Sequence, residues 1–377
     1  MTRLLARLED FRLLPVFVVV SMAIGIAIGN ALSISDFALT PPIDALKSIA
    51  AGTFEPTVPT LISLGVPIGL FAMMYPAMTN VRLGEIGKAF RSPRQLGVVL
   101  FFNFLVAPFF MLLLANVFVA DPELRTGLIL YGLAPCIAMV IIFTYLAKGN
   151  TPMALVFVAL NSVIQMLLIP VYARLLIGDV SFDVSVVAQS VVLYLGLPLV
   201  AGVLTRALVV RRGGEAAMER LKPGLNALSI LGFLFTLIVM FALKGDLILQ
   251  RPQIVLEMAV PMAIFFFVMF SVVYLVSARL GFSYEDAVAV AFNSTGRDFE
   301  IAIAIAITAF SPTVALATVV GPLIEVPVML ALVWGAMRLR PRLFGRSSSA
   351  PALEPASMGA HGPQLVGDPM LKGADAD

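Results

Sequence analysis

Apolar stretches long enough to cross a lipid bilayer recur along the chain and are separated by short polar breaks. A transmembrane α-helix needs about 20 predominantly apolar residues, and these stretches have that length. The pattern therefore predicts an all-α polytopic membrane protein with ten transmembrane helices. The predicted helices cover residues 13–34, 58–79, 96–119, 125–147, 152–177, 184–208, 225–244, 253–277, 285–309 and 313–337.

The distribution of Lys and Arg favours a topology with both termini in the cytoplasm. In that orientation the great majority of the basic residues fall in inside segments, as the positive-inside rule requires. A missed or additional helix early in the chain would destroy this asymmetry. We therefore expect residues 1–344 to form the transmembrane domain. Residues 345–377 are rich in Ser, Pro, Ala and Gly, which predicts a disordered cytoplasmic tail.

The composition supports a membrane protein and excludes several other classes. The chain is 60% hydrophobic and 13% charged, whereas soluble domains carry about 25% charged residues. A net charge of +2 argues against a nucleic-acid partner. With one cysteine, Cys136, and one histidine, His361, neither an intramolecular disulfide nor a His/Cys zinc site is expected. No predicted span contains His, and neither an HExxH motif nor a paired Asp motif on two helices occurs, so an intramembrane hydrolase is disfavoured. We expect no enzyme and no cofactor, and a channel or sensor is a further alternative.

The two halves of the chain resemble each other weakly. A shift of 160 residues places Thr151 and its following proline on Ser311 and its following proline. The matched units are separated by an odd number of helices, so they would run in opposite directions through the membrane. This predicts two inverted five-helix repeats, at about 13–177 and 184–337. Inverted repeats are typical of secondary carriers, whose substrate site lies near the membrane midplane.

Corresponding helices in the two halves are interrupted in the middle of the span. The fourth predicted helix contains Gly132 and Pro135, and the ninth contains a polar run from Asn293 to Asp298. Such breaks persist in a membrane only where they face protein or a water-filled cavity. The matched interruptions therefore predict a transport site at helices 4 and 9. A pair of purely structural kinks is the alternative.

Four ionisable residues lie in the predicted ninth and tenth helices. Arg297, Asp298 and Glu300 fall in the ninth and Glu325 in the tenth, and each costs roughly 2.5–3.5 kcal/mol to insert. Arg297 and Glu300 are three residues apart, so we expect them to share a helix face and to pair. Ionised together, the four groups sum to −2, which predicts a carboxyl group that carries a proton or a bound cation. A static salt-bridge network is the alternative.

One thiol and several amides complete the candidate site. Cys136 lies beside the break in helix 4, and a soft thiolate binds soft centres such as arsenic(III). A single thiol makes a single As–S bond, which suits the reversible binding of a carrier. The alternative role is small apolar filler. Asn161, Gln165 and Asn293 are expected either to line the site or to bond neighbouring helices.

Four stretches carry a resemblance to a known family, and they read PIGLFAMMYP (67–76), GLAPCIAMV (132–140), FEIAIAIA (299–306) and GPLIEVPV (321–328). The chain resembles the Acr3 arsenite efflux family within the bile acid/sodium symporter superfamily. The resemblance implies a panel domain and a core domain, with broken helices 4 and 9 crossing in the core. It also implies extrusion of arsenite, or of antimonite, across the inner membrane by proton antiport. Cys136 matches the essential helix-4 cysteine of the family, and Glu300 matches its helix-9 glutamate.

The chain departs from the family pattern at the two breaks. Pro135 stands where many members have Arg, and Arg297-Asp298 stands where two Asn are common. A second interpretation therefore stays open, namely a sodium- or proton-coupled symporter of a small organic anion, with Arg297 as the carboxylate partner. The expected partners are arsenite, protons or sodium as the coupling ion, and membrane lipid. The expected substrate-binding residues are Cys136, Glu300, Asn161 and Asn293, and the expected coupling residues are Glu300, Asp298, Arg297, Glu325 and Gln165.

Overall fold

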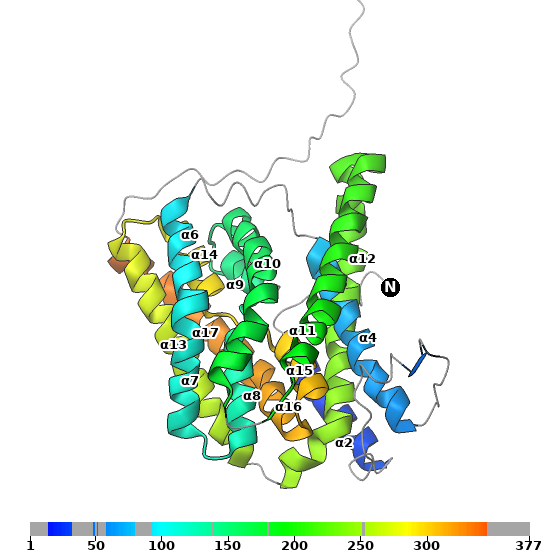
Figure 1. Cartoon of the computed structure of the whole chain (residues 1–377). Coiled ribbons are helices and arrows are strands. Elements are labelled where there is room, and N and C mark those ends of the chain that lie inside the picture. The colour runs from blue at the N-terminus through cyan, green and yellow to red at the C-terminus, as the bar shows by residue number, and fades with distance from the viewer. Residues whose placement is uncertain are drawn as a thin grey trace, which may run out of the picture.

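The computed structural model describes residues 14–31, 48–49, 51, 58–79, 92–137, 139–178, 181–250 and 253–344, and all regular elements in these ranges are helices (Figure 1). The predicted tail at 345–377 lies outside the described residues. The first half contains α2 (Leu14–Ala31), α4 (Val58–Thr79), α6 (Pro93–Leu100), η3 (Phe101–Val106), α7 (Ala107–Phe118), α8 (Pro122–Leu133), α9 (Met139–Leu146) and α10 (Thr151–Leu176). The second half contains α11 (Val184–Val191), η4 (Val192–Gly196), α12 (Leu197–Gln250), α13 (Gln253–Arg279), α14 (Tyr284–Thr295), α15 (Phe299–Ala309), α16 (Pro312–Val319) and α17 (Gly321–Leu343).

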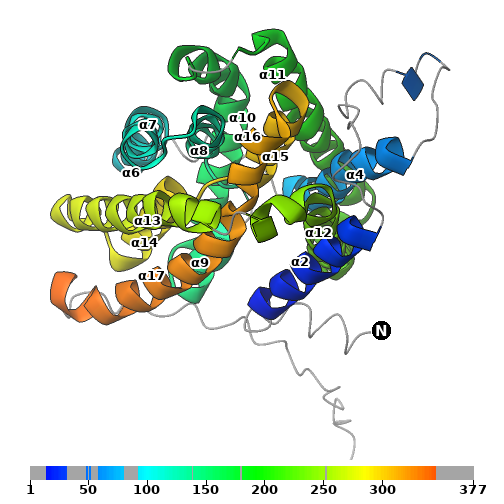
Figure 2. The ribbon, with the colours of Figure 1, turned by 90° about the horizontal axis from the view of Figure 1, so that it is seen from below.

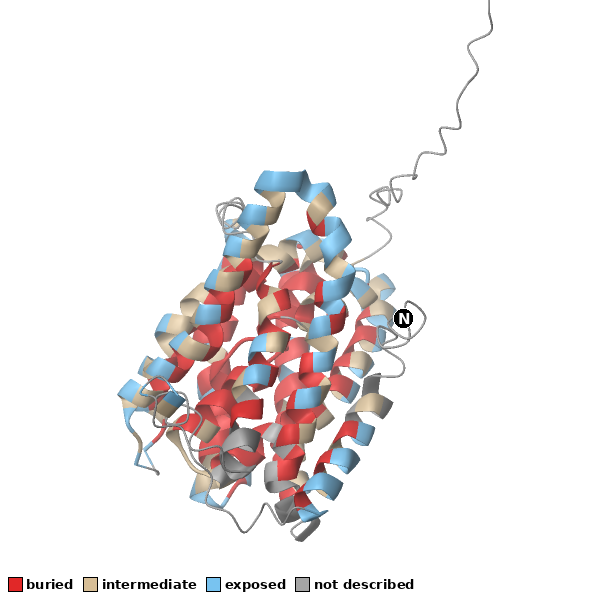
Figure 3. Cartoon of the chain, turned by 90° about the vertical axis from the view of Figure 1, so that its right-hand side faces the viewer, coloured by how far each residue is buried: buried red, intermediate tan, exposed pale blue. Residues whose placement is uncertain are grey.

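The helices have the length and the outer surface of membrane-spanning elements. Figure 3 shows that buried residues fill the interior of the bundle, while exposed residues lie on its outside. Many exposed side chains are large and apolar, such as Leu167 at 67% and Leu256 at 69% exposure, as expected of a surface in contact with lipid. Five helical segments are long and apolar enough to cross a membrane, at Pro93–Phe118, Thr151–Leu176, Val184–Val239, Gln253–Arg279 and Thr313–Leu343.

Two of the predicted spans are each divided into two short helices. α8 and α9 together cover the predicted helix 125–147, and α14 and α15 cover 285–309. Neither short helix alone is long enough to cross a bilayer, because each residue adds only about 1.5 Å. The protein is therefore an all-helical polytopic membrane protein with interrupted helices. The total of ten spans and the inverted relation of the halves remain predictions.

The segment between residues 208 and 225 is helical, and the loop predicted there is wrong. α12 runs through it to residue 250, and Gly214, with φ 68°, is its one non-helical position. A glycine tolerates this left-handed φ, so the chain can turn there. Figure 1 shows the two limbs of α12 side by side, and Arg206 pairs with Glu215 across the turn at 2.7 Å. Many charged residues of this segment, such as Arg and Glu, are good helix formers. Their polarity therefore indicates that the segment is exposed to water, and it does not exclude a helix.

The helices form two groups that meet at the start of α15. α2, α4 and α12 pack against one another on one side of the molecule (Figure 2), while α6 to α10, α13, α14 and α17 lie on the other. Glycines allow close approach in the first group, since Gly69 of α4 faces Thr236 of α12. Phe233 of α12 contacts Phe299 of α15, with ring centroids 5.8 Å apart. The two groups therefore touch directly beside the break in helix 9.

Candidate functional site

The two broken helices cross at their breaks. The peptide N–H of Cys136 donates to the carbonyl oxygen of Gly296 at 3.0 Å, and the N–H of Asp298 donates to the carbonyl oxygen of Ala134 at 2.8 Å. These bonds form an isolated antiparallel bridge between the two extended segments. The backbone groups that the helix breaks release thus satisfy each other across the crossing, as membrane burial requires.

Local chemistry explains why the chain leaves the helical conformation at these points. Pro135 has no N–H to donate, and it lies directly opposite Arg297 in the bridge. The side chain of Asp298 accepts a hydrogen bond from the N–H of Ile301 at 3.1 Å and so caps the start of α15. The ends of four half-helices meet here, and their partial charges are concentrated at the crossing.

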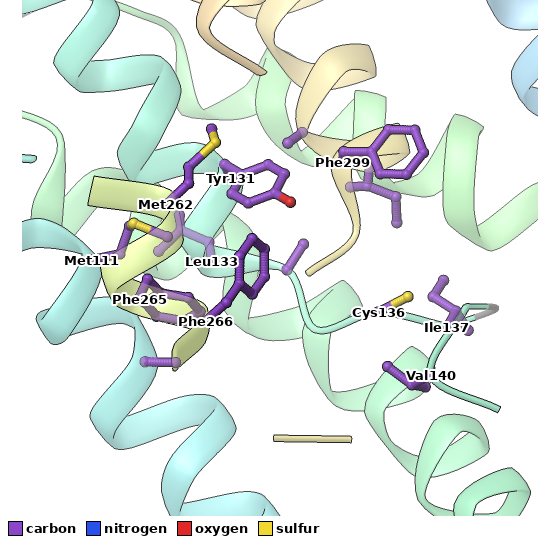
Figure 4. Packing of buried hydrophobic residues seen from close by; sticks show 14 of the residues in the cluster. Met111, Tyr131, Leu133, Cys136, Ile137, Val140, Met262, Phe265, Phe266 and Phe299 are labelled. Carbon is purple, nitrogen blue, oxygen red and sulfur yellow. The ribbon is translucent and has the colours of Figure 1, made fainter. Parts of the chain in front are cut away.

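Cys136 occupies the bridge and is 2% exposed. Figure 4 shows it on the extended segment that follows α8, with Ile137 and Val140 after it. Gly296 makes this approach possible, because a Cβ there would lie 2.4 Å from Cγ1 of Val140 and 3.1 Å from Cβ of Cys136. The single thiol of the chain therefore lies in the tightest part of the crossing.

The fit at Gly296 leads to a prediction. We expect Gly296→Ala to destabilise the crossing by about 1–3 kcal/mol, the usual cost of overpacking, and to slow transport. The additional change Val140→Ala removes the clashing methyl group and should restore part of both properties. Gly97→Ala is a matched control, since a Cβ at Gly97 meets nothing within 4 Å. Thermal unfolding of the purified variants checks this prediction. Equal unfolding temperatures for Gly296→Ala and Gly97→Ala would contradict it.

The expected ion pair between Arg297 and Glu300 is wrong. Residues 296–298 are not helical, so the shared helix face on which the pair depended does not exist. The guanidinium group of Arg297 is fully buried, and it turns back toward α8, α14 and η3, where four oxygen atoms accept its hydrogen bonds. These acceptors are the carbonyl oxygens of Gly132, Ser294 and Thr295 and the side-chain Oδ1 of Asn103.

Glu325 joins the site through a partner that the sequence analysis missed. The hydroxyl of Tyr131 donates to its Oε2 at 2.6 Å, and the peptide N–H of Arg297 donates to its Oε1 at 3.3 Å. Both oxygens of this buried carboxyl group are therefore occupied. Gly321 makes room for the tyrosine, because a Cβ there would lie 2.5 Å from the Tyr131 ring. Glu325 thus holds α17 against both breaks.

The Tyr131–Glu325 contact gives a second prediction. Tyr131→Phe leaves Oε2 of Glu325 without its donor inside the protein, and hydrogen bonds to charged groups contribute about 1.5–3 kcal/mol. We expect a lower unfolding temperature with proton coupling retained. Tyr145→Phe is a matched control, since Tyr145 is 71% exposed. Loss of coupling without loss of stability in Tyr131→Phe would show that the tyrosine moves protons instead.

Asp298 and Glu300 form a buried pair of carboxyl groups. Asp298 is 1% and Glu300 7% exposed, and they lie two residues apart at the start of α15, where Oδ2 of Asp298 has no hydrogen-bond partner. Two neighbouring buried carboxylates repel each other when both are ionised, so a proton on either one stabilises the pair. The bridge joins Cys136 to Gly296 and Asp298 to Ala134 through backbone hydrogen bonds, and Glu325 accepts from the N–H of Arg297 between them. The structure thus brings Cys136, Arg297, Asp298, Glu300 and Glu325 together.

The buried amides expected at the site are partly or wholly without protein partners. Both polar atoms of Asn161 and both of Gln165 are unpaired, as are Oδ1 of Asn293 and Oγ of Ser294. Asn161 and Gln165 lie one helical turn apart on α10, which packs against α8, α9 and α14. Asn293 donates to the carbonyl oxygen of Ala289 within its own helix. Unpaired buried polar groups are uncommon and indicate positions where water or a ligand binds.

The arrangement of His, Cys, Asp and Glu residues bears on metal binding at the site. In the ranges that the structure describes, no three His, Cys, Asp or Glu residues form a group that could hold a metal ion. Chemistry at the crossing therefore depends on one thiol with carboxyl groups near it. Asn103 also belongs to this site but was not among the expected site residues, because the π-helical segment η3 that presents it has no recognisable sequence pattern.

Comparisons with known proteins identify relatives over most of the chain. A family described as the sodium bile acid symporter family matches residues 67–251. The arsenical-resistance protein Acr3 of Corynebacterium glutamicum is 33% identical over 355 residues, covering 90% of this chain and 92% of that protein. Acr3 of Alkaliphilus metalliredigens is 34% identical over 320 residues, covering 78% and 89%. An uncharacterised transporter of Synechocystis is 35% identical over 297 residues, covering 72% and 78%.

Proposed function

The chain is an Acr3-type transporter that belongs to the sodium bile acid symporter family, and from this membership we propose that it expels arsenite across the inner membrane by proton antiport. The observation that carries the proposal is the position of Cys136, the only thiol of the chain, in the bridge between two broken helices. Ten spans in two inverted repeats, with both termini in the cytoplasm, are part of the same proposal. Antimonite, which has similar chemistry, is a second expected substrate.

Binding at Cys136 follows from the chemistry of arsenic(III). Arsenite is neutral As(OH)3 at pH 7, so it enters a buried site without the penalty that a charged solute pays. The thiol attacks arsenic, one As–O bond breaks as the As–S bond forms, and the thiol proton leaves with the hydroxyl group as water. A neighbouring carboxyl group can pass this proton. Hydrolysis of the As–S bond reverses each step and returns the thiol.

The remaining hydroxyl groups of bound arsenite need hydrogen-bond partners inside the protein. The unpaired amides of Asn161 and Gln165 supply donors and acceptors, and the unpaired Oδ1 of Asn293 supplies an acceptor. A buried polar group that gains such a partner no longer pays its full desolvation penalty. We therefore assign these amides to substrate recognition and to the hydration of the site.

Proton coupling is assigned to Asp298 and Glu300. A proton taken up from outside neutralises one of two adjacent buried carboxyl groups, and its loss to the cytoplasm restores their repulsion. This difference can favour one orientation of the transporter over the other. The group of α2, α4 and α12 would rock against the remaining helices, and the Phe233–Phe299 contact is the point where the two groups meet beside the site.

The organic-anion symporter is the second candidate, and one observation weakens it. That function needs a cation free to bind a substrate carboxylate, and Arg297 was the residue expected to supply it. The Arg297 guanidinium is fully buried and already donates to four oxygen atoms. An incoming carboxylate would have to displace these bonds. Cys136 also has no role in binding an organic anion.

Uptake into everted membrane vesicles tests the proposal. We expect arsenite to accumulate when the vesicle interior is acidic, and we expect the accumulation to vanish when the proton gradient is collapsed. A sodium gradient alone should not drive it. Accumulation that follows sodium in place of protons would reject the coupling. No arsenite accumulation in vesicles that contain folded protein would reject the substrate and favour an organic anion.

A further inference from the structure

The guanidinium group of Arg297 lies where the C-terminal ends of two half-helices meet. Its Nη1 donates to the carbonyl oxygen of Gly132 at 3.3 Å, near the end of α8. Its Nη2 and Nε donate to the carbonyl oxygens of Ser294 and Thr295, at the end of α14, at 2.6 and 3.2 Å. The side-chain Oδ1 of Asn103 accepts a fourth bond at 2.7 Å. We infer that Arg297 is a tethered cation, whose guanidinium group fills a cation-binding site formed by these neutral oxygens.

The charge of the site explains why a cation is needed there. The last carbonyl groups of a helix have no partner within the helix, and they carry the negative end of its dipole. α8 and α14 bring two such ends together in the protein interior. Without a cation, these oxygens would be buried and unpaired, and they would repel each other. In carriers with discontinuous helices, such half-helix ends and unwound carbonyls are the groups that hold coupling cations.

The ligands of Arg297 are those of a bound cation and not those of an ion pair. An arginine that served mainly to neutralise the nearby carboxyl groups would bind one of them directly, usually in bidentate fashion. Its guanidinium instead contacts three carbonyl oxygens and one amide oxygen, and among the described residues no carboxylate accepts from it. Hard cations such as alkali and alkaline-earth ions prefer neutral and anionic oxygen ligands of this kind.

The surroundings hold the guanidinium group in place from two further sides. The ring of Phe265, on α13, lies 5.3 Å from the guanidinium carbon and covers its face. Asn103 is itself oriented, because its Nδ2 donates to the carbonyl oxygen of Asn293 at 3.0 Å. It projects from η3, and π-helical segments often occur at functional positions. Arg297 therefore connects η3, α8, α13 and α14 through one charged group.

Arg297 is accordingly a positioning residue for the crossing. A cation that is covalently attached cannot be exchanged between the two sides of the membrane, so this position cannot couple transport to a mobile metal cation. The crossing keeps its geometry at every external sodium concentration. This role does not depend on which solute the protein carries, so it can be tested without arsenite.

Removal of the side chain should leave an empty site that a free cation can fill. We expect Arg297→Ala, purified as the full chain in lipid nanodiscs, to unfold at a lower temperature than wild type. Low-millimolar guanidinium chloride should raise that temperature by several degrees and the rise should saturate, while wild type stays unchanged. Sodium chloride is tested for a smaller effect, with choline chloride as the ionic-strength control. A thiol-reactive dye follows unfolding at Cys136, which is the only cysteine and is 2% exposed.

Matched variants separate a lost cation from a lost side chain. Arg338→Ala removes an arginine that covers the ring of Trp334, and its unfolding temperature should not respond to guanidinium. If Arg297→Ala does not fold, Arg297→Lys and Arg297→Met are compared, and the charged variant should unfold at the higher temperature. The inference is overturned if Arg297→Ala is as stable as wild type, if no added cation changes its stability, or if the Lys and Met variants are equally stable.

Discussion

Cys136→Ser is expected to reduce arsenite accumulation in everted vesicles to the level of vesicles that lack the protein. Serine keeps the size of the side chain but replaces a soft sulfur with a hard oxygen, which has little preference for arsenic(III). The thiol is the only one in the chain, so no neighbouring cysteine can substitute for it. Binding and release at the crossing should therefore both be lost.

The effect must be separated from misfolding, because Cys136 is buried in the bridge. Size-exclusion profiles and unfolding temperatures of Cys136→Ser and Cys136→Ala should stay close to those of wild type. Ile137→Val is the matched control, because it trims the next buried residue by one methyl group and costs about 0.5–1.5 kcal/mol. It should retain transport. If Cys136→Ser still accumulates arsenite, the cysteine is apolar filler and the substrate binds elsewhere.

Glu300→Gln is expected to abolish accumulation driven by the proton gradient while arsenite still exchanges down its own gradient. Glutamine keeps the shape of the side chain, but it cannot take up and release a proton. Glu300 is 7% exposed, against 1% for Asp298 and 0% for Glu325. We therefore assign the mobile proton to Glu300 first among these three carboxyl groups. Counterflow of labelled arsenite measures the exchange that remains.

Glu325→Gln serves as the comparison for this result. Both oxygens of Glu325 already accept hydrogen bonds, from Tyr131 and from the backbone of Arg297. An amide at this position would turn one acceptor into a donor facing another donor, so the loss should appear in stability first. Gradient-driven accumulation that survives in Glu300→Gln would assign the proton to another group. Loss of coupling in Glu325→Gln with unchanged stability would make Glu325 that group.

The positions of the helix breaks were predictable because they depend on local chemistry. Pro135 and Gly132 weaken a helix wherever they occur, and the polar run from Asn293 to Asp298 has no place in lipid. Apolar length predicted the main helices for the same reason. Local chemistry also misled at one point, since the i,i+3 pairing of Arg297 with Glu300 assumed a continuous helix that the break removes.

The partners across the crossing were not predictable from the sequence. Tyr131 and Glu325 are 194 residues apart, and so are Asn103 and Arg297. No periodic pattern connects positions at such separation, because the contact depends on how two broken helices cross in space. The turn of α12 at Gly214 falls within the predicted break between residues 208 and 225, but the helical structure on both sides of it was missed for a different reason. The residues beside Gly214 are charged, and hydropathy therefore indicated a loop. Many of the same residues have a high helix propensity, which hydropathy does not measure.

X-ray absorption at the arsenic edge tests the central claim most directly. Purified wild-type protein and Cys136→Ser are both loaded with arsenite. The number and type of atoms bonded to arsenic are then determined in each protein and compared. One sulfur neighbour per arsenic, with oxygen completing the shell, is the result expected of wild type, and the variant should show oxygen alone. Oxygen alone in both proteins would contradict a thiol-bound substrate at the helix crossing.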